Sequence, residues 1–333
     1  MKQCAVLSFS DRGRELAQKI ADILAEDWEV NCVHPRGDLS ETAGRLFASC
    51  DALIFVGACG IAVRAIAPFV ASKTTDPAVL VVDERGRHVI SLLSGHIGGA
   101  NDLTKHIASA ISAYPVITTA TDVNGRFSVD AWAAKQGLLI DDMQLAKRFS
   151  AEILKRDLPL YSELPIEGKL PDGIFLSAEG DLGAAVSYRT AGSFQKTLRL
   201  IPKCLHVGIG CRRGTPARQI RSLVEDTLTE YGIDLRAVKQ IASIDVKADE
   251  EGLLLYAEAL SVPVRFFSAE QLRQAPGEYT ASAFVQEQVG VDNVCERAAI
   301  LSAGDDAKLI IRKTASSGVT LAVAQENRRL TFE

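Results

Sequence analysis

The feature that most constrains this chain is an alternation of short apolar runs with segments of helical periodicity. Residues 52–58, ALIFVGA, form a continuous apolar run that ends among glycines, which is typical of a strand buried on both faces. Before that run, Leu16, Ile20 and Leu24 recur at the spacing of one helical face. Because strands and helices alternate, we expect an α/β fold with a parallel or mixed sheet covered by helices.

The regularity of this alternation divides the chain into three parts. The pattern holds over residues 1–130 and resumes over 204–333, whereas prolines and glycines interrupt short strands over 131–203. We therefore expect N-terminal and C-terminal α/β domains joined by a small middle α/β domain. Within them we expect a hairpin turn at 84–87, and the last domain is predicted to hold strand 238–244.

Composition excludes several classes of protein. Lys plus Arg number 37 and Asp plus Glu number 42, so the net charge of −5 argues against nucleic-acid or membrane-surface partners. The seven cysteines include no C-x-x-C pair, which indicates neither a zinc knuckle nor a disulfide framework. The start of the chain has no signal-peptide pattern, and no apolar run approaches the ~18 residues of a membrane span. We expect a cytoplasmic protein; a homo-oligomer stays open.

The strongest local signal is a histidine among small residues, between an apolar strand and a helical pattern. The residues of this run that we expect to act are Ser94, Gly95, His96, Gly98, Gly99 and Asn101. Glycines permit close approach of a ligand, and the first amides of a helix suit a carboxylate or an oxyanion. His96 can hold or transfer a proton near neutral pH. The alternative is a tight turn in which His96 only bonds to a carbonyl.

Two other glycine turns also join a strand to a helix. Gly57 and Gly60 flank Cys59, with Arg64 one turn further on; we favour packing over thiolate chemistry for this cysteine. Residues 208–214, GIGCRRG, miss the dinucleotide fingerprint by one residue and lack the lysine of a phosphate-binding loop.

Basic residues accompany these turns. Arg212 and Arg213 suit carboxylates, because guanidinium pairs with them bidentately, although a solvated arginine pair is the alternative. Lys73 and Thr74 precede a strand and Lys247 follows one, in loops of the kind that bind ligands in open α/β sheets.

The order of two long motifs resembles a known family. The N-terminal string KTTDPAVLVVDERGRHVISLLSGHIGGAN, with VGIGCRRGTP, IASIDVKADEEGLL and FFSAEQL further on, is similar to the cobalt-precorrin-5A hydrolases, the CbiG family of anaerobic cobalamin biosynthesis. The resemblance covers about 50–125 and about 204–325. The chain departs from it at Arg297, where the family has proline, and just after Lys313.

The resemblance implies a specific reaction. These enzymes open the δ-lactone of cobalt-precorrin-5A, and acetaldehyde leaves to give cobalt-precorrin-5B. The substrate is a cobalt tetrapyrrole edged with carboxylates; the cobalt belongs to the substrate, and neither an enzyme cofactor nor an enzyme-bound metal is implied. Two other functions stay open: a non-catalytic tetrapyrrole carrier of the same pathway and a nucleotide-dependent α/β enzyme.

We expect His96 to act as general base or to position water, with Glu84 or Asp83 assisting. Backbone amides of 98–101 are expected to stabilise the tetrahedral oxyanion. The residues expected to bind substrate are Gly57, Gly60, Arg64, Lys73, Thr74, Ser94, Gly95, Gly98, Gly99, Asn101, Gly208, Gly210, Arg212, Arg213 and Lys247.

Overall fold

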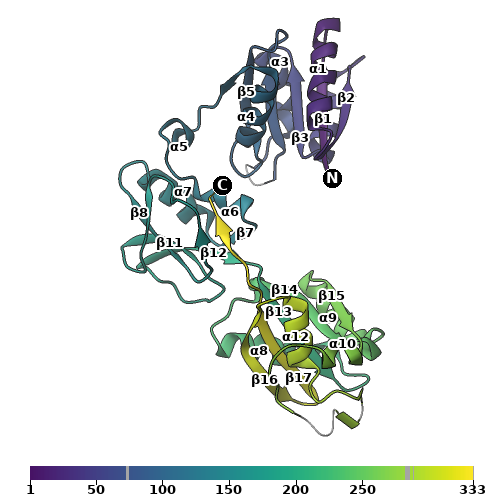
Figure 1. Cartoon of the computed structure of the whole chain (residues 1–333). Helices are drawn as coiled ribbons and strands as arrows, with labels where there is room; N and C mark the ends of the chain where they lie inside the picture. Colours follow the sequence, from purple (N-terminus) through teal and green to yellow (C-terminus); the bar gives the residue numbers. More distant parts are fainter. Residues whose placement is uncertain (73–74, 282–285, 288, 333) are drawn as a thin grey trace. The chain divides into compact units, whose positions relative to one another are not determined.

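The computed structural model describes the chain except for residues 73–74, 282–285, 288 and 333 (Figure 1). The chain forms two compact units. The first comprises Met1–Ala134 with Ile153–Arg156, and the second comprises Lys135–Glu152 with Asp157–Glu333. The expected α/β class is confirmed in both units. The division at 130/131 and 203/204 stays a prediction.

The first unit is built on one mixed sheet with the strand order β2-β1-β3-β4-β5-β6. Its strands are β1 (Lys2–Ser8), β2 (Trp28–Val33), β3 (Ala52–Val56), β4 (Ala78–Val82), β5 (His88–Leu93) and β6 (Tyr114–Val116). All neighbours are parallel except β4 and β5, which are antiparallel and joined by the predicted hairpin turn. Strands β5 and β6 therefore end at the edge where β1, β3 and β4 begin.

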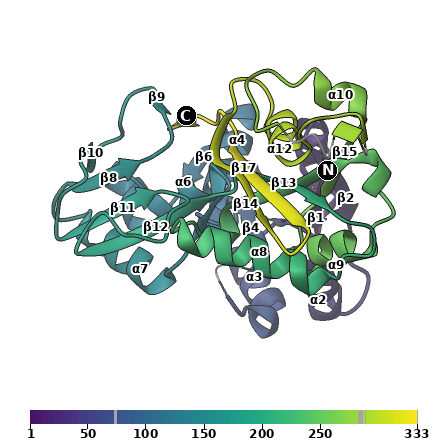
Figure 2. The same cartoon turned by 90° about the horizontal axis from the view of Figure 1, so that it is seen from below.

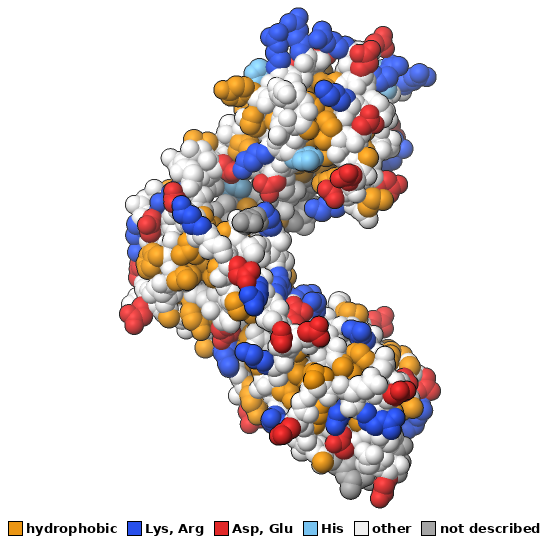
Figure 3. Space-filling view, viewed as in Figure 1, with side chains coloured by type: hydrophobic (Ala, Val, Ile, Leu, Met, Phe, Trp, Pro, Cys, Tyr) orange, Lys and Arg blue, Asp and Glu red, His pale blue; other side chains and the backbone are white. Residues whose placement is uncertain are grey.

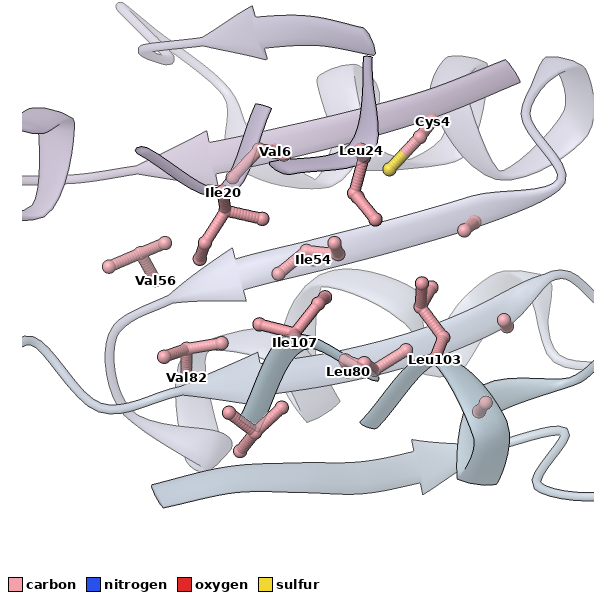
Figure 4. Close-up of a cluster of buried hydrophobic side chains, with 14 of the residues drawn as sticks. Cys4, Val6, Ile20, Leu24, Ile54, Val56, Leu80, Val82, Leu103 and Ile107 are labelled. Atoms are coloured by element: carbon pink, nitrogen blue, oxygen red, sulfur yellow. The ribbon is translucent and has the colours of Figure 1, made fainter. Parts of the chain in front are cut away.

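Helices cover both faces of this sheet. Those that pack against it are α1 (Asp11–Leu24), α2 (Leu39–Ser49), α3 (Cys59–Ile66) and α4 (Ala100–Ile111), and the unit also contains the 3-10 turn η1 (Ala67–Phe69), α5 (Ala120–Val123) and α6 (Val129–Lys135). Figure 4 shows Ile20 of α1 and Leu103 and Ile107 of α4 against Ile54 and Leu80 of the strands. Side chains of α2 and α3 pack in a second core on the opposite face. Each large apolar side chain buried here stabilises the fold by roughly 1.5–3 kcal/mol relative to exposure.

The second unit begins with a small mixed sheet of order β10-β8-β11-β12-β7. Its elements are β7 (Leu138–Ile140), α7 (Met143–Glu152), β8 (Leu158–Ser162), β9 (Ile166–Glu167), β10 (Ile174–Leu176), β11 (Leu182–Val186) and β12 (Lys196–Pro202). Only β7 runs antiparallel to its neighbour, and α7 packs on β11 and β12. Strand β9 stands outside this sheet and pairs with β18 (Leu330–Thr331) near the end of the chain.

The larger sheet of the second unit has the order β15-β14-β13-β17-β16. Its elements are β13 (Leu205–Cys211), α8 (Ala217–Glu230), η2 (Leu235–Ala237), β14 (Val238–Ile244), η3 (Asp245–Lys247), α9 (Glu251–Leu260), β15 (Val264–Phe267), α10 (Ala269–Arg273), α12 (Cys295–Ala303), β16 (Lys308–Ser316) and β17 (Val319–Gln325). Figure 2 shows α8 and α9 on one face and α12 on the other. Strand 238–244 is as predicted, whereas α12 has no counterpart in the sequence analysis.

Helix α12 explains one of the predicted binding glycines. A Cβ atom on Gly208 of β13 would lie 1.9 Å from the carbonyl oxygen of Cys295 and 2.8 Å from the amide nitrogen of Ala299. Glycine at this position lets the backbone of α12 rest directly on the strand. The prediction that Gly208 binds substrate is corrected, because its open side is occupied by the helix.

We predict that Gly208→Ala destabilises the second unit by about 3 kcal/mol or more, since the clash involves backbone that cannot move aside. The control is Gly210→Ala in the same strand, where the nearest atom is the Thr320 side-chain oxygen at 2.7 Å, which can rotate away. Urea unfolding of both variants measures the effect. An equal or smaller loss for Gly208→Ala would contradict this account of the helix packing.

Candidate functional site

His96 lies in the loop between β5 and α4, where the chain turns back on itself. Ser94 has a left-handed backbone with φ of 57°, and Gly99 follows with φ of 81°. The carbonyls of Ser94, Gly95 and His96 accept hydrogen bonds from the amides of Ala100, Asn101 and Gly99, at 3.2, 2.9 and 3.0 Å. The hydroxyl of Ser94 is buried without a hydrogen-bond partner. A non-glycine residue in this backbone conformation stores strain of the kind found at functional sites.

These contacts correct part of the expected mechanism. Three of the four amides over residues 98–101 already donate to carbonyls of the same loop. The loop folds over the start of α4 and supplies the acceptors that the first turn of a helix otherwise lacks. These three amides are therefore not free to stabilise an oxyanion.

Both ring nitrogens of His96 meet carboxylates. Nε2 lies 3.0 Å from Oδ2 of Asp122, and Nδ1 lies 3.2 Å from Oδ1 of Asp130. The hydroxyl of Ser128 is 3.1 Å from Nδ1 and donates to Asp130 at 2.8 Å. Burial lowers the pKa of His96, but hydrogen bonds to Asp130 and Asp122 and their charges outweigh it and raise the pKa above 6.5. The geometry thus favours an imidazolium that donates from both nitrogens.

Asn101 holds this cluster in place. Its side chain is buried and donates to Asp122 at 2.9 Å and to the Thr119 hydroxyl at 3.0 Å. Its amide oxygen accepts from Ser91 at 2.7 Å. Asn101 was expected to bind substrate, but these contacts make it a positioning residue for Asp122.

Lys105 of α4 completes the charge balance, with its ammonium 3.1 Å from the other oxygen of Asp122. Burial raises the pKa of Asp122, but hydrogen bonds from His96 and Lys105 outweigh it and lower the pKa below 3.8. Asp122 is therefore ionised near neutral pH and supports the positive charge of His96.

Sequence reasoning missed the partners of His96. Asp122 lies in α5, Ser128 precedes α6, and Asp130 lies in α6. All of them follow β6, which is parallel to β5, so the carboxyl ends of the two strands meet at one edge. The polar residues that follow β6 in the sequence were the available signal, because loops that follow neighbouring parallel strands converge.

The expected assistance from Glu84 or Asp83 is wrong. Both lie in the turn after β4, and the register pairs Val82 with Val89 but Val79 with Leu93. The turn and the His96 loop are therefore at opposite edges of the sheet, separated by the length of β4 at about 3.3 Å per residue.

Turn residues here have structural partners. Asp83 accepts from the amides of Arg85, Arg87 and His88 at 2.9, 2.9 and 2.6 Å. Glu84 accepts from Ser10, the residue that caps α1. These bonds shape the hairpin and fix it to the start of α1.

Some of the predicted binding residues of the first unit also lie far from His96. The segment after β3 contains Gly57, Gly60 and Arg64. It lies at the edge of the sheet where β3 and β4 end, which is the edge of Glu84 and is opposite to that of His96. Lys73 and Thr74 lie outside the described residues. Cys59 packs against the core under α2 and α3, in line with the packing interpretation.

A cavity of about 770 Å³ opens in the larger sheet of the second unit, within the usual range for ligand sites. It lies where β13 and β14 end, β17 begins and α12 starts. Four predicted residues line it: Gly210, Arg212, Arg213 and Lys247. Lys313 lines it too, although the sequence analysis gave it no role.

Two of these cations already have partners. Arg213 pairs with Asp249 at 2.6 Å, and Lys247 pairs with Glu250 at 3.1 Å. Glu250 is buried and also accepts from the amide of Gly214 at 2.6 Å. A carboxylate thus sits where a phosphate would meet this glycine loop, which argues against the nucleotide hypothesis.

Arg297, where the sequence was expected to depart from the family pattern, stabilises the start of α12 through its side chain. Its guanidinium donates to Asp292 at 2.9 Å and to the carbonyl of Leu272 at 3.1 Å. The same group lies over the ring of Tyr279, 4.5 Å from its centroid. These contacts hold the segment that leads into α12.

Cysteines, helices and charged side chains were compared over the described part of the chain. All seven cysteines are free thiols. None of its helices has the length and apolar character needed to span a bilayer, and no group of three or more His, Cys, Asp or Glu side chains there is arranged to hold a metal ion. On the face drawn in Figure 3, basic and acidic side chains are interspersed over much of the surface.

Fold and site define a class: an α/β protein with a histidine held between two aspartates in one unit and a cation-lined cavity in the other. Residues 41–122 match the family described as cobalamin synthesis G N-terminal, and residues 205–324 match cobalamin synthesis G C-terminus. The chain belongs to the cobalamin synthesis G family.

Relatives extend over nearly the whole chain. A protein of Salmonella typhimurium named cobalt-precorrin-5A hydrolase is 39% identical, over 86% of this chain and 85% of its own. One of the same name from Priestia megaterium is 31% identical, over 96% and 94%. A solved structure of a cobalamin biosynthesis protein G homologue from Sulfolobus solfataricus is 23% identical, covers 97% of each chain and has a TM-score of 0.45.

We predict that the His96 ring titrates above pH 6.5 in the folded protein, because two carboxylates stabilise its charge. Asp130→Asn removes one of them and lowers this pKa, measured by NMR of the ring with His96→Gln to assign the signal. By linkage, the stability that His96 contributes is complete below pH ~6.5 and is lost as the pH rises through its folded pKa. A midpoint below 6.5 would contradict this electrostatic account.

Proposed function

We propose that this protein is a cobalt-precorrin-5A hydrolase of anaerobic cobalamin biosynthesis. It opens the δ-lactone of its substrate, releases acetaldehyde and yields cobalt-precorrin-5B. The observation that carries the proposal is the 39% identity to a protein of that name over 86% of this chain. Similarity of this extent spans both units, so it supports the whole activity and more than a shared domain.

The substrate class sets what the site must recognise. A cobalt tetrapyrrole is a wide, largely apolar ring with acetate and propionate carboxylates at its rim, and its metal arrives with it. We propose that the protein works in the cytoplasm, which fits seven unpaired cysteines. That it needs no nucleic-acid partner remains an expectation, and a homo-oligomer stays open.

The chemistry at His96 differs from the general base expected from sequence. An imidazolium with both N–H groups on carboxylates has no lone pair to accept a proton from water. We assign it the opposite role, donation of a proton to the oxygen that leaves as the lactone opens. Asp122 and Asp130 keep the proton in place until that oxygen develops negative charge.

The lactone opens first, and acetaldehyde is released in a second step. Water adds to the lactone carbonyl, the ring C–O bond breaks, the departing oxygen takes the proton of His96, and His96 recovers a proton from the added water. The alcohol so formed then loses its proton to solvent and its C–C bond to the macrocycle breaks. The electron pair of that bond enters the conjugated macrocycle, and acetaldehyde leaves.

We predict that His96→Gln lowers acetaldehyde release by roughly 10²–10⁴-fold, the usual contribution of a proton-transfer residue. The assay incubates cobalt-precorrin-5A with enzyme and an aldehyde trap. The matched control is His106→Gln, since His106 is an exposed histidine on α4 and should be dispensable. Near-normal turnover of folded His96→Gln would remove His96 from the reaction.

The pH profile separates the two roles of His96. As a proton donor, the wild-type enzyme loses activity as the pH rises through the raised pKa of His96, and Asp130→Asn moves this loss to lower pH. A general base would instead gain activity over the same interval. Tight binding of the substrate without any acetaldehyde would favour the carrier function.

A further inference from the structure

Two cations that line the cavity of the second unit, Arg212 and Lys313, form no ion pair with any residue that the structure describes. We infer that Arg212 and Lys313 bind rim carboxylates of the tetrapyrrole there, so that this cavity is the substrate's anchoring site. The inference rests on the proposed function for the identity of the ligand. It adds Lys313 to the site and removes Arg213 and Lys247 as primary contacts.

The four basic residues of the cavity differ in whether their side chains form ion pairs. Arg213 and Lys247 are each paired with a carboxylate of their own loop, at 2.6 and 3.1 Å. Among the described residues, the side chains of Arg212 and Lys313 have neither an ion pair nor a hydrogen bond. An incoming carboxylate gains most from cations that need not first break an existing pair.

The backbone directs Lys313 toward this role. The pairing of β16 with β17 shifts register between Ile311 and Thr314, so Lys313 stands at an irregularity in the strand. Irregularities of this kind re-aim a side chain and are common next to functional sites. Lys313 lines the cavity from this position.

A buried carboxylate fixes that irregularity. Glu296 of α12 is fully buried and accepts from the amide of Lys313 at 2.8 Å. It also accepts from the amide of Thr280 at 2.7 Å and from the side chain of Asn293 at 2.7 Å. Burying a carboxylate is costly unless several donors satisfy it, so this arrangement holds the strand firmly. Glu296 is a positioning residue for Lys313.

A tight turn between β16 and β17 contacts Arg212, which also lines the cavity. Ser317 and Gly318 join β16 to β17 with φ of 51° and 81°, and the amide of Arg212 donates to the carbonyl of Gly318 at 3.3 Å. A Cβ atom on Gly318 would lie 3.1 Å from Cδ of Arg212, so the aliphatic part of the arginine rests on the glycine. The guanidinium is thus carried at the rim of the cavity.

The remaining surface of the cavity fits a large ring ligand. Ile244, Val294 and Val319 give it apolar walls, and the hydroxyls of Ser316 and Thr320 add polar groups. The cavity lies at the carboxyl ends of β13 and β14, beside the point where the chain crosses through α12 to β16. Open α/β sheets bind ligands at such positions. Apolar walls with separated cations suit an apolar macrocycle with anionic side chains better than a small inorganic anion.

The test uses a corrinoid that does not react. Cobyrinic acid, with free carboxylates, and its fully amidated form are titrated into the full-length protein, and binding is followed by calorimetry. Arg212→Met and Lys313→Met each keep the aliphatic chain and remove the charge. We expect each to raise the Kd for cobyrinic acid about tenfold, in the range of one charge-assisted hydrogen bond.

The control is Arg213→Met, a neighbour of similar exposure whose charge is paired, which we expect to change the Kd by less than about threefold. Thermal unfolding verifies that all variants are folded. The amidated corrinoid should bind weakly and respond to none of the substitutions. Equal affinity for the two corrinoids, or an unchanged Kd in both Arg212→Met and Lys313→Met, would overturn the inference.

Acetaldehyde release is measured on the same preparations, so that the hydrolase function and the anchoring site are tested independently. Wild-type protein that releases acetaldehyde while the two variants bind cobyrinic acid normally refutes the anchoring site alone. Charge-dependent binding of cobyrinic acid without any acetaldehyde release refutes the hydrolase and leaves the anchoring site in place.

Discussion

The direction of each strand determines which groups in this protein meet. Loops that follow parallel strands emerge at one edge of a sheet, and both candidate regions are assembled in this way. In the first unit β5 runs against β4, so the His96 loop joins the segment after β6 and is separated from the loops after β3 and β4. In the second unit the loops after β13 and β14 converge with the end of β16 around the cavity.

Buried and half-buried carboxylates organise both regions. Asp122 and Asp130 fix a histidine, Glu250 holds a glycine loop together with a lysine, and Glu296 anchors an irregular strand. Each lies where desolvation would penalise an unpaired charge, and each is compensated by several donors. The consequence is chemical: neighbouring cations are either neutralised, as in the Glu250 loop, or left available to a ligand, as we infer for Lys313.

Local patterns predicted much of this structure. Apolar runs and helical spacing gave the α/β class, the hairpin at 84–87 and strand 238–244, because these depend on neighbouring residues. The two aspartates that contact His96 lie 26 and 34 residues further along the chain, and no periodicity reports such a contact. The hairpin did contain usable information: it reverses β5, so Glu84 and His96 had to lie at opposite edges. Gly208 shows a second reason why sequence-based prediction fails. A glycine allows both close packing of a helix backbone and close approach of a ligand, so the sequence alone cannot separate the two roles.

The pairing of β18 with β9 has a consequence for biosynthesis. Leu330, which is fully buried, belongs to a strand whose partner is residue 166, so the two are separated by about half the chain. On the ribosome, β9 emerges long before β18 exists, and this part of the second unit is incomplete until residues 330–331 have been translated. Cleavage or mutation at residues 330–331 would therefore destabilise the region around β9, which is translated much earlier.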